Sequence, residues 1–442
     1  MEALPEYLSP STDTEFVTDG KALRTNFLWT FLGNGIYSVC QWGMLSVLAK
    51  LTNPQSVGYF ALGLAITAPI MMFFNMQLRE VQATDARGEF RYKDYFGFRL
   101  GSTLLALVVI VLIAGSYGGR ASAIILILGA AKGFEALSDI VYGFLQKHEI
   151  MIRISKSMIL KGILSLTSLG ILTWLTKNIL VGCLGLLFTW GALFIAYDLR
   201  GPSIISAERP VYPSSGLTRS TARKILSRAL PLGIASLLMS LRANIPRYVI
   251  ESVMGSYQLG IFSAMAYPMV AGNTIVTALG QTAVPGLARH YAKGDIRAFT
   301  ILILKGLGVA LAIGLAGISV AAIAGRWLLS LIYTNEYAQH NAVFVLLMTA
   351  GAVGYLWFFL GYALTAARRF HIQTISFAVN LLVTLALCLA FKGSGILGVS
   401  RAILLGSISQ VIIGGIALAR VIGEGSMPNP GASISMRPPV ES

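Results

Sequence analysis

Hydrophobic stretches of about 20 residues recur along most of the chain, and short polar breaks separate them. An α-helix of that length crosses the roughly 30 Å hydrocarbon core of a bilayer, and the breaks are too short to hold a soluble domain. We therefore predict an all-α polytopic membrane protein with about twelve transmembrane helices. The predicted spans are residues 26–49, 56–78, 96–117, 121–146, 155–175, 178–197, 226–253, 257–283, 299–324, 341–367, 370–391 and 396–422.

The composition agrees with this prediction, because 55% of the residues are hydrophobic and only 12% are charged. Soluble globular domains are about 25% charged. The three cysteines, Cys40, Cys183 and Cys388, all fall inside predicted spans. We expect them to pack as small apolar side chains rather than to form disulfides.

Basic residues gather in alternate loops between the predicted spans. The remaining loops carry about one each, so the positive-inside rule puts the basic loops and both termini in the cytoplasm. The formal charge of +15 then reflects orientation in the membrane, and we expect no nucleic-acid partner. The basic loop residues are Arg79, Arg87, Arg91, Lys93, Lys147, Arg153, Lys156, Arg200, Arg209, Arg219, Arg223, Lys224, Arg289, Lys293, Arg297, Arg368 and Arg369.

One of these loops lies within the charged stretch NMQLREVQATDARGEFRYKDYFGFR, from Asn75 to Arg99. Its positive charge is enough to fix the orientation beside anionic lipid. The alternative is a cytoplasmic entrance, where a short surface helix meets an anionic substrate head group. The candidate entrance residues are Arg79, Arg87 and Arg91.

Two sequence matches at one offset indicate an internal repeat. GYFALG at Gly58 reappears as GIFSAM at Gly260, and DARGEF reappears as LARHYA, both 202 residues later. Six helices return the chain to its starting side, so the halves form a parallel repeat about an axis along the membrane normal. Pro69 and Pro268 are each expected to bend the second helix of their half. We predict a cytoplasmic tail over 1–25, an N-lobe over 26–198, a cytoplasmic linker over 199–225, a C-lobe over 226–422 and a disordered tail over 423–442.

The first helix of each half carries a polar stripe with residue spacings of 4, 4, 3 and 4, which put its members on one helical face. Such faces either line a shared cavity or hydrogen-bond between packed helices. In the second stripe, Arg247 either faces the cavity or pairs with Glu251 four residues later. Arg242 lies about half a turn off that stripe, and Pro246 leaves its direction open. The stripes are Asn26, Thr30, Asn34, Tyr37 and Gln41, and Ser236, Ser240, Asn244, Arg247 and Glu251.

The fourth predicted helix carries Lys132, Glu135, Asp139 and Gln146 on one side. Desolvation makes carboxylates at membrane depth suitable for exchanging H⁺ or Na⁺. These charged residues are therefore candidates for ion coupling. A self-contained bridge between Lys132 and Glu135 is the alternative, and it leaves Asp139 without an explanation.

The sequence contains no Walker loop, metal-ligand cluster or nucleophile elbow, and its four histidines are scattered. We therefore expect no metal, no cofactor and no ATP hydrolysis. The histidines are His148, His290, His340 and His371.

Several segments resemble bacterial oligosaccharide repeat-unit flippases, the polysaccharide transporter branch of the multidrug/oligosaccharidyl-lipid/polysaccharide exporter superfamily. They are NMQLREVQATDA (75–86), DYFGFR (94–99), FEALSDIVYGFLQK (134–147), NIPRYVI (244–250) and LGIFSAMAYP (259–268). The resemblance implies a V-shaped fold of two six-helix lobes in the bacterial cytoplasmic (inner) membrane. It implies alternating access that moves undecaprenyl-pyrophosphate-linked oligosaccharide to the periplasmic leaflet for O-antigen (lipopolysaccharide), capsule or exopolysaccharide assembly. A polysaccharide polymerase and a chain-length regulator are the implied protein partners. Lipid II flippases of the same superfamily commonly have two further helices, which this chain lacks.

The polar residues suit that task, since arginine grips phosphate with two parallel hydrogen bonds and amides and tyrosine suit sugar hydroxyls. The candidate cleft residues are Arg247, Asn244, Arg242, Asn34, Tyr37 and Gln41. A multidrug-type, cation-coupled exporter is the first alternative, and it predicts an acidic cleft. A membrane-embedded glycan polymerase or transferase is the second, and it requires a fixed acid or base and a larger external region.

Overall fold

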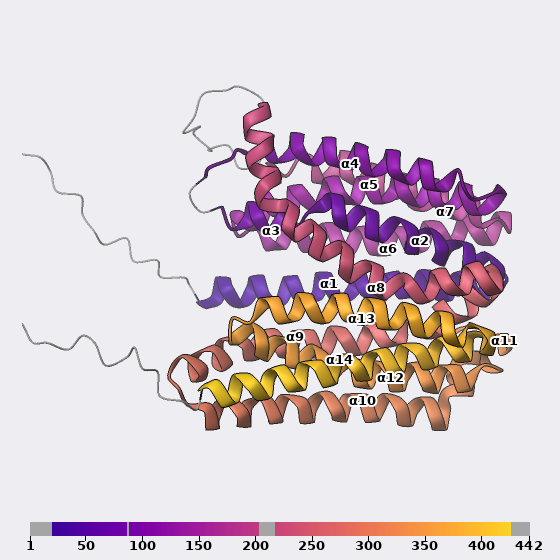
Figure 1. The fold of residues 1–442 in the computed structure, drawn as a ribbon. Coiled ribbons are helices and arrows are strands. Elements are labelled where there is room, and N and C mark those ends of the chain that lie inside the picture. The colour runs from indigo at the N-terminus through magenta and orange to yellow at the C-terminus, as the bar shows by residue number, and fades with distance from the viewer. Residues whose placement is uncertain (1–19, 86–87, 203–216, 426–442) are drawn as a thin grey trace, which may run out of the picture.

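The computed structural model describes residues 20–85, 88–202 and 217–425, and within these ranges the secondary structure is helical (Figure 1). Most of the two predicted tails, part of the predicted linker and Arg87 lie outside the described residues. The helices are α1 (Gly20–Leu51), α2 (Pro54–Asn75), α3 (Leu78–Ala83), α4 (Tyr92–Ala114), α5 (Gly119–Lys147), α6 (Met151–Thr176), α7 (Ile179–Leu193), α8 (Arg219–Ala266), α9 (Pro268–Ala292), α10 (Ile296–Ile332), α11 (Asn335–Ala338), α12 (Asn341–Ala366), α13 (Phe370–Phe391) and α14 (Gly395–Gly425).

Each predicted span overlaps a helix, and local chemistry sets several of the ends. The side chain of Asn53 caps α2 by accepting a hydrogen bond from the Ser56 backbone N–H. Asn178 caps α7 in the same way through the Leu180 N–H. The span predicted to end at 78 ends at Asn75, because Met76 and Gln77 take left-handed conformations with φ of 50° and 47°.

In the part of the chain that the structure describes, eight helical stretches are long and apolar enough to cross a membrane by composition alone. One of them, Arg219–Ala292, joins α8 to α9, and another, Ile375–Gly423, includes most of α13 and α14. Helices α1 and α5 are not among the eight, although both are long. The count of twelve crossings therefore stays a prediction.

The helices form two bundles, with α1, α2 and α4–α7 in one and α9, α10 and α12–α14 in the other (Figure 1). Helix α8 runs between the bundles and contacts both, and its most extensive packing is against α2. Near its start, Ile225 and Ala229 are buried against Met76 and Tyr95 of the first bundle. The predicted proline bends differ, since Pro69 lies inside a continuous α2 whereas Pro268 begins α9 after a break at Tyr267.

The two bundles meet at the end of the molecule opposite Gly20 and Gly425, which we call the far end (right in Figure 1); the end holding Gly20 and Gly425 is the tail end. The repeat-related glycines lie at this crossing of α2 and α8. A Cβ on Gly58 would lie 1.7 Å from the Ser256 carbonyl oxygen, and a Cβ on Gly260 would lie 1.9 Å from the Pro54 carbonyl oxygen. Any side chain at either position would therefore force α2 and α8 apart at the far end.

Candidate functional site

A polar cluster lies at the centre of the first bundle, where α1 and α5 bring three predicted residues together. The Tyr37 hydroxyl donates to Glu135 Oε1 over 2.5 Å, and Lys132 Nζ pairs with Glu135 Oε2 over 2.5 Å. Lys132 Nζ also lies 5.1 Å from the ring centroid of Trp190. The predicted Lys132–Glu135 bridge is present, and Tyr37 extends it to a second helix.

The structure also shows a more deeply buried ion pair, which the sequence analysis did not predict. Lys161 of α6 and Asp198 are both about 2% exposed, and Lys161 Nζ lies 3.5 Å from Asp198 Oδ2. Lys161 also donates to Ser138 and Tyr142, over 2.9 and 3.2 Å. Asp198 ends a π-helical turn, Phe194–Asp198, a rare geometry that often marks functional sites. The sequence does offer an indication of this site, because Lys161 lies inside the apolar predicted span 155–175.

Asp139 lies away from Glu135, in a network at the tail end of the first bundle. Its carboxylate pairs with Arg99 over 3.2 Å and with Arg79 over 3.5 Å. Arg99 is completely buried and also donates to Asn75 over 2.5 Å. The two candidate ion-coupling carboxylates therefore occupy different environments, and Asp139 neutralises a buried arginine.

Of the three candidate entrance residues, Arg79 and Arg91 lie in the described part of the chain. Arg79 lies on α3 and takes part in the Asp139 network. Arg91 directly precedes α4, and its backbone N–H donates to Asp94. Arg87 lies outside the described residues, so the entrance stays a prediction.

The different roles of the two carboxylates are testable. Asp139→Asn removes the main counter-charge of the buried Arg99. Because the Asp139 side chain is 29% exposed, the cost in stability should lie below the about 3–5 kcal/mol of a fully buried pair. We expect this variant to show a lower heat-denaturation midpoint and a lower amount in the membrane. Glu135→Gln keeps hydrogen bonds to Tyr37 and Lys132, so it should reach the membrane normally and slow transport instead.

Glu149→Gln is the matched control, because Glu149 is an exposed carboxylate at the same end of the bundle. Glu149→Gln should change neither the stability and amount of the protein nor its transport. Equal losses of protein from Asp139→Asn and Glu135→Gln would contradict the distinction, and so would normal transport by Glu135→Gln at every pH and Na⁺ concentration tried.

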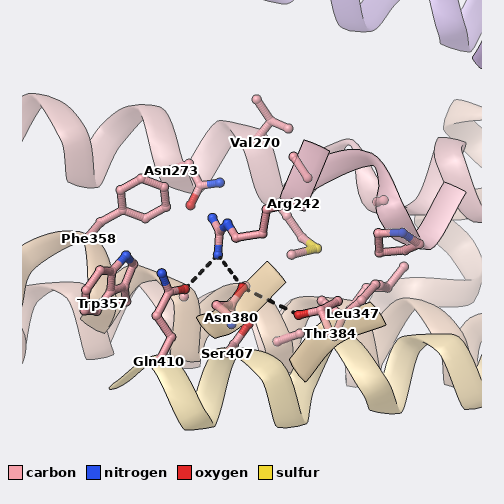
Figure 2. A pocket seen from close by; sticks show the side chains of 18 of the residues that line it. Arg242, Val270, Asn273, Leu347, Trp357, Phe358, Asn380, Thr384, Ser407 and Gln410 are labelled. Carbon is pink, nitrogen blue, oxygen red and sulfur yellow. Dashed lines mark hydrogen bonds between the residues drawn. The ribbon is translucent and has the colours of Figure 1, made fainter. Parts of the chain in front are cut away.

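A cavity with a volume of about 200 Å³ lies inside the second bundle, walled by α8, α9, α12, α13 and α14 (Figure 2). Arg242 and Arg247 both line it. Its other polar lining comes from Asn273, Asn380, Thr384, Ser407 and Gln410, and its aromatic lining from Phe262, Trp357 and Phe358. No carboxylate is among the described residues that line it, so this lining is cationic, unlike the acidic cleft that the multidrug alternative predicts.

The structure decides the direction of Arg242, which the sequence left open. Its Nη1 donates to Gln410 Oε1 over 2.7 Å and to Asn380 Oδ1 over 3.2 Å (Figure 2). The guanidinium carbon lies 5.6 Å from the ring centroid of Phe377. Arg242 therefore points into the second bundle and joins α8 to α13 and α14 through neutral amides.

Arg247 bonds within its own helix and not to Glu251. Its Nη1 donates to the Ala243 carbonyl oxygen over 2.9 Å and to Asn244 Oδ1 over 3.1 Å. Glu251 instead accepts a hydrogen bond from Ser256 over 2.8 Å. The suggested Arg247–Glu251 pair is therefore wrong, and the charge of Arg247 is available to the cavity.

The other stripe residues divide between packing and exposed positions. Ser236 accepts a hydrogen bond from Gln77 over 3.0 Å, which joins α8 to the end of α2. Asn34 is exposed and donates to the Thr30 carbonyl oxygen, whereas Gln41 is half-buried. The first stripe therefore reaches the Glu135 cluster through Tyr37, while the second reaches the cationic cavity through Arg247.

Comparison with known proteins identifies the family. The model of the polysaccharide biosynthesis protein family matches residues 23–290, which is more than half of the chain. The chain belongs to this family. The capsular polysaccharide biosynthesis protein CapF of Staphylococcus aureus is 27% identical over 348 residues, which cover 79% of this chain and 87% of that protein.

Solved transporter structures share the fold. An inward-facing multidrug resistance MATE family transporter of the MOP superfamily matches with a TM-score of 0.72 at 14% identity, covering 90% of this chain and 98% of that chain. The lipid II flippase MurJ, in an inward closed conformation, matches with a TM-score of 0.71 at 12% identity, covering 90% of each chain. The predicted exporter-like all-α fold and the resemblance to polysaccharide transporters are thereby confirmed. This chain is therefore a multi-pass membrane protein of that family.

Proposed function

We propose that this protein flips an undecaprenyl-pyrophosphate-linked oligosaccharide from the cytoplasmic to the periplasmic leaflet of the bacterial inner membrane. The observation that carries the proposal is a cavity among apolar helices of a polysaccharide biosynthesis protein, whose described lining includes two arginines and no carboxylate. A buried cation without a counter-ion is costly in a membrane, and an anionic substrate would relieve that cost. The likeness to CapF supports a capsule or a related surface polysaccharide as the product.

In this proposal the pyrophosphate of the lipid carrier binds Arg247. Arg247 lines the cavity, and its Nη1 is held by hydrogen bonds within its own helix, which leave Nε and Nη2 as donors for a ligand. Arginine binds phosphate oxygens through two parallel charge-assisted hydrogen bonds, so it orients the head group as well as attracting it. A pyrophosphate has acceptors for several such bonds, which suits a cavity without acidic residues.

The proposed transport cycle alternates access between the two membrane faces. Positive loops at the tail end favour a cytoplasmic position for that end and for both termini, so the far end would face the periplasm. Contacts at the far end then describe a state closed to the periplasm, and they include the Trp42–Tyr333 hydrogen bond of 3.1 Å between the bundles. The likeness to two inward conformations supports this assignment.

Ion coupling is also proposed, through the Tyr37–Lys132–Glu135 cluster. A carboxylate held between a tyrosine and a lysine at membrane depth can change its partners when a proton or Na⁺ arrives. Movement of α1 against α5 would then follow the charge on Glu135, because the Tyr37 hydrogen bond joins these two helices.

The direct test measures lipid-linked oligosaccharide in each leaflet of cells that lack this protein. We expect the lipid-linked oligosaccharide to accumulate in the cytoplasmic leaflet, protected from a glycan-modifying enzyme added to the periplasmic face. Reintroducing the gene should again expose the lipid-linked oligosaccharide to the enzyme at the periplasmic face within one round of synthesis. Unchanged leaflet distribution in the deletion strain would refute the proposal.

A further inference from the structure

The side chain of Arg242 has an unused edge that faces the cavity. Its Nη1 is occupied by Gln410 and Asn380, whereas neither Nε nor Nη2 donates a hydrogen bond to the described residues, and Nε is buried. Figure 2 shows the guanidinium between Asn273 on one side and Asn380 and Gln410 on the other. The Nε and Nη2 hydrogens are parallel, so this edge is shaped for two oxygens of one planar group.

A second unpartnered donor lies beside it. Gln410 is 1% exposed and lines the cavity, and its Nε2 has no hydrogen-bond partner while its Oε1 accepts from Arg242. Buried polar groups are nearly always satisfied, so an unpaired donor beside an unpaired arginine edge indicates a ligand with acceptor oxygens.

The remaining lining favours a sugar over a phosphate. Trp357 and Phe358 add aromatic faces, and Asn273 adds an amide opposite the arginine. Flat apolar faces with a few amides suit a ring that has apolar C–H faces and hydroxyl groups at its edge. The cavity volume of about 200 Å³ is compatible with one monosaccharide ring.

We infer that the cavity is a subsite for an acidic sugar of the transported oligosaccharide, with the sugar carboxylate on the Nε/Nη2 edge of Arg242. The inference rests on the proposed function, because it assumes that a glycan enters the cavity. It separates two anions on one substrate: Arg247 takes the pyrophosphate, and Arg242 takes a uronate. Asn273, Asn380 and Gln410 surround Arg242 with amides, which suit the hydroxyl groups of a sugar beside its carboxylate.

The test uses the full-length protein in lipid nanodiscs and three probes: glucuronate, glucose and inorganic pyrophosphate. Titration calorimetry and the heat-denaturation midpoint report binding. We expect millimolar glucuronate to bind and to raise the midpoint, and we expect glucose, which has the same ring without the carboxylate, to bind far more weakly. Arg242→Gln should weaken glucuronate binding by at least about tenfold, since charge-assisted hydrogen bonds are lost.

Further variants distinguish a lost ligand contact from a damaged fold. Arg242→Lys keeps a cation near Gln410 and Asn380 but has no planar edge, so glucuronate should also bind it at least about tenfold more weakly. Arg326→Gln changes an exposed arginine on α10 outside the cavity and should bind glucuronate as the unmodified protein does. Arg247→Gln should lose the pyrophosphate response and keep the glucuronate response.

The outcomes separate this inference from the proposed function. If glucuronate binds no better than glucose, or binds Arg242→Lys with full affinity, the acidic-sugar subsite is refuted while flipping can still be measured in cells. If pyrophosphate binding depends on Arg242 and glucuronate does not bind, Arg242 belongs to the pyrophosphate site. If flipping itself is absent from cells, the proposed function fails irrespective of these titrations.

Discussion

Gly260→Ala is expected to abolish most transport while the protein still reaches the membrane. The added Cβ would lie 1.9 Å from the carbonyl oxygen of Pro54 and 2.8 Å from its carbonyl carbon, which are backbone atoms of α2 that cannot rotate away. Overpacking of this kind costs about 1–3 kcal/mol, and here the cost falls on the state in which the bundles touch at the far end. A cycle that must visit that state would slow by about tenfold or more.

The same substitution at another glycine provides the control. A Cβ on Gly35 of α1 has nothing within 4 Å, so Gly35→Ala should leave transport unchanged and even favour the helix slightly. Gly58→Ala should behave like Gly260→Ala, since its Cβ would lie 1.7 Å from the Ser256 carbonyl oxygen.

Gly260→Ala should shift the protein away from the state that is closed at the far end. Spin labels at two exposed far-end positions, Gln55 on α2 and Asn335 on α11, can measure this shift directly. The native Cys40, Cys183 and Cys388 are buried, so labels should attach to the introduced cysteines. Gly260→Ala should lengthen the distance between the labels, and Gly35→Ala should not. An unchanged distance together with normal transport would show that the glycine contact is dispensable.

Arg247→Ala is the second change expected to have a large effect, with transport falling by about ten- to a hundredfold from the loss of charge-assisted hydrogen bonds to the substrate. Arg247→Lys should retain partial transport, because it keeps the charge but loses the planar fork. Protein amount should stay normal in both variants, since the hydrogen bonds of Arg247 lie within α8. Leaflet distribution of the lipid-linked oligosaccharide and immunodetection of the protein are the two measurements.

Glu251 separates this prediction from a purely structural role for Arg247. Because Glu251 bonds to Ser256 and not to Arg247, Glu251→Gln should leave the effect of Arg247→Ala unchanged when the two are combined. Normal flipping by a well-expressed Arg247→Ala protein would remove Arg247 from the substrate site. Rescue of Arg247→Ala by the second substitution would instead restore the ion-pair interpretation.

The helical fold was predictable because a bilayer imposes one length and one polarity on every crossing segment. Each predicted span overlaps a helix, and two sequence matches at one offset singled out Gly58 and Gly260, which lie close together. The 3.6-residue period also placed Asn244 and Arg247 on one helical face, where they share a hydrogen bond. Positions of charged residues within apolar segments marked Glu135, Asp139 and Arg247 as residues that require partners.

Only the tertiary structure decided which partners those residues have. Periodicity describes one helix at a time, so it cannot tell that Asp139 neutralises Arg99 while Glu135 bonds to Tyr37 on another helix. The direction of Arg242 depends on its partners, because Asn380 of α13 and Gln410 of α14 hold its guanidinium and neither helix is identifiable from the sequence of α8. The contact that brings Gly58 and Gly260 together joins residues far apart in sequence. The short distance between them depends on how the helices pack together, which the sequence of one helix does not determine.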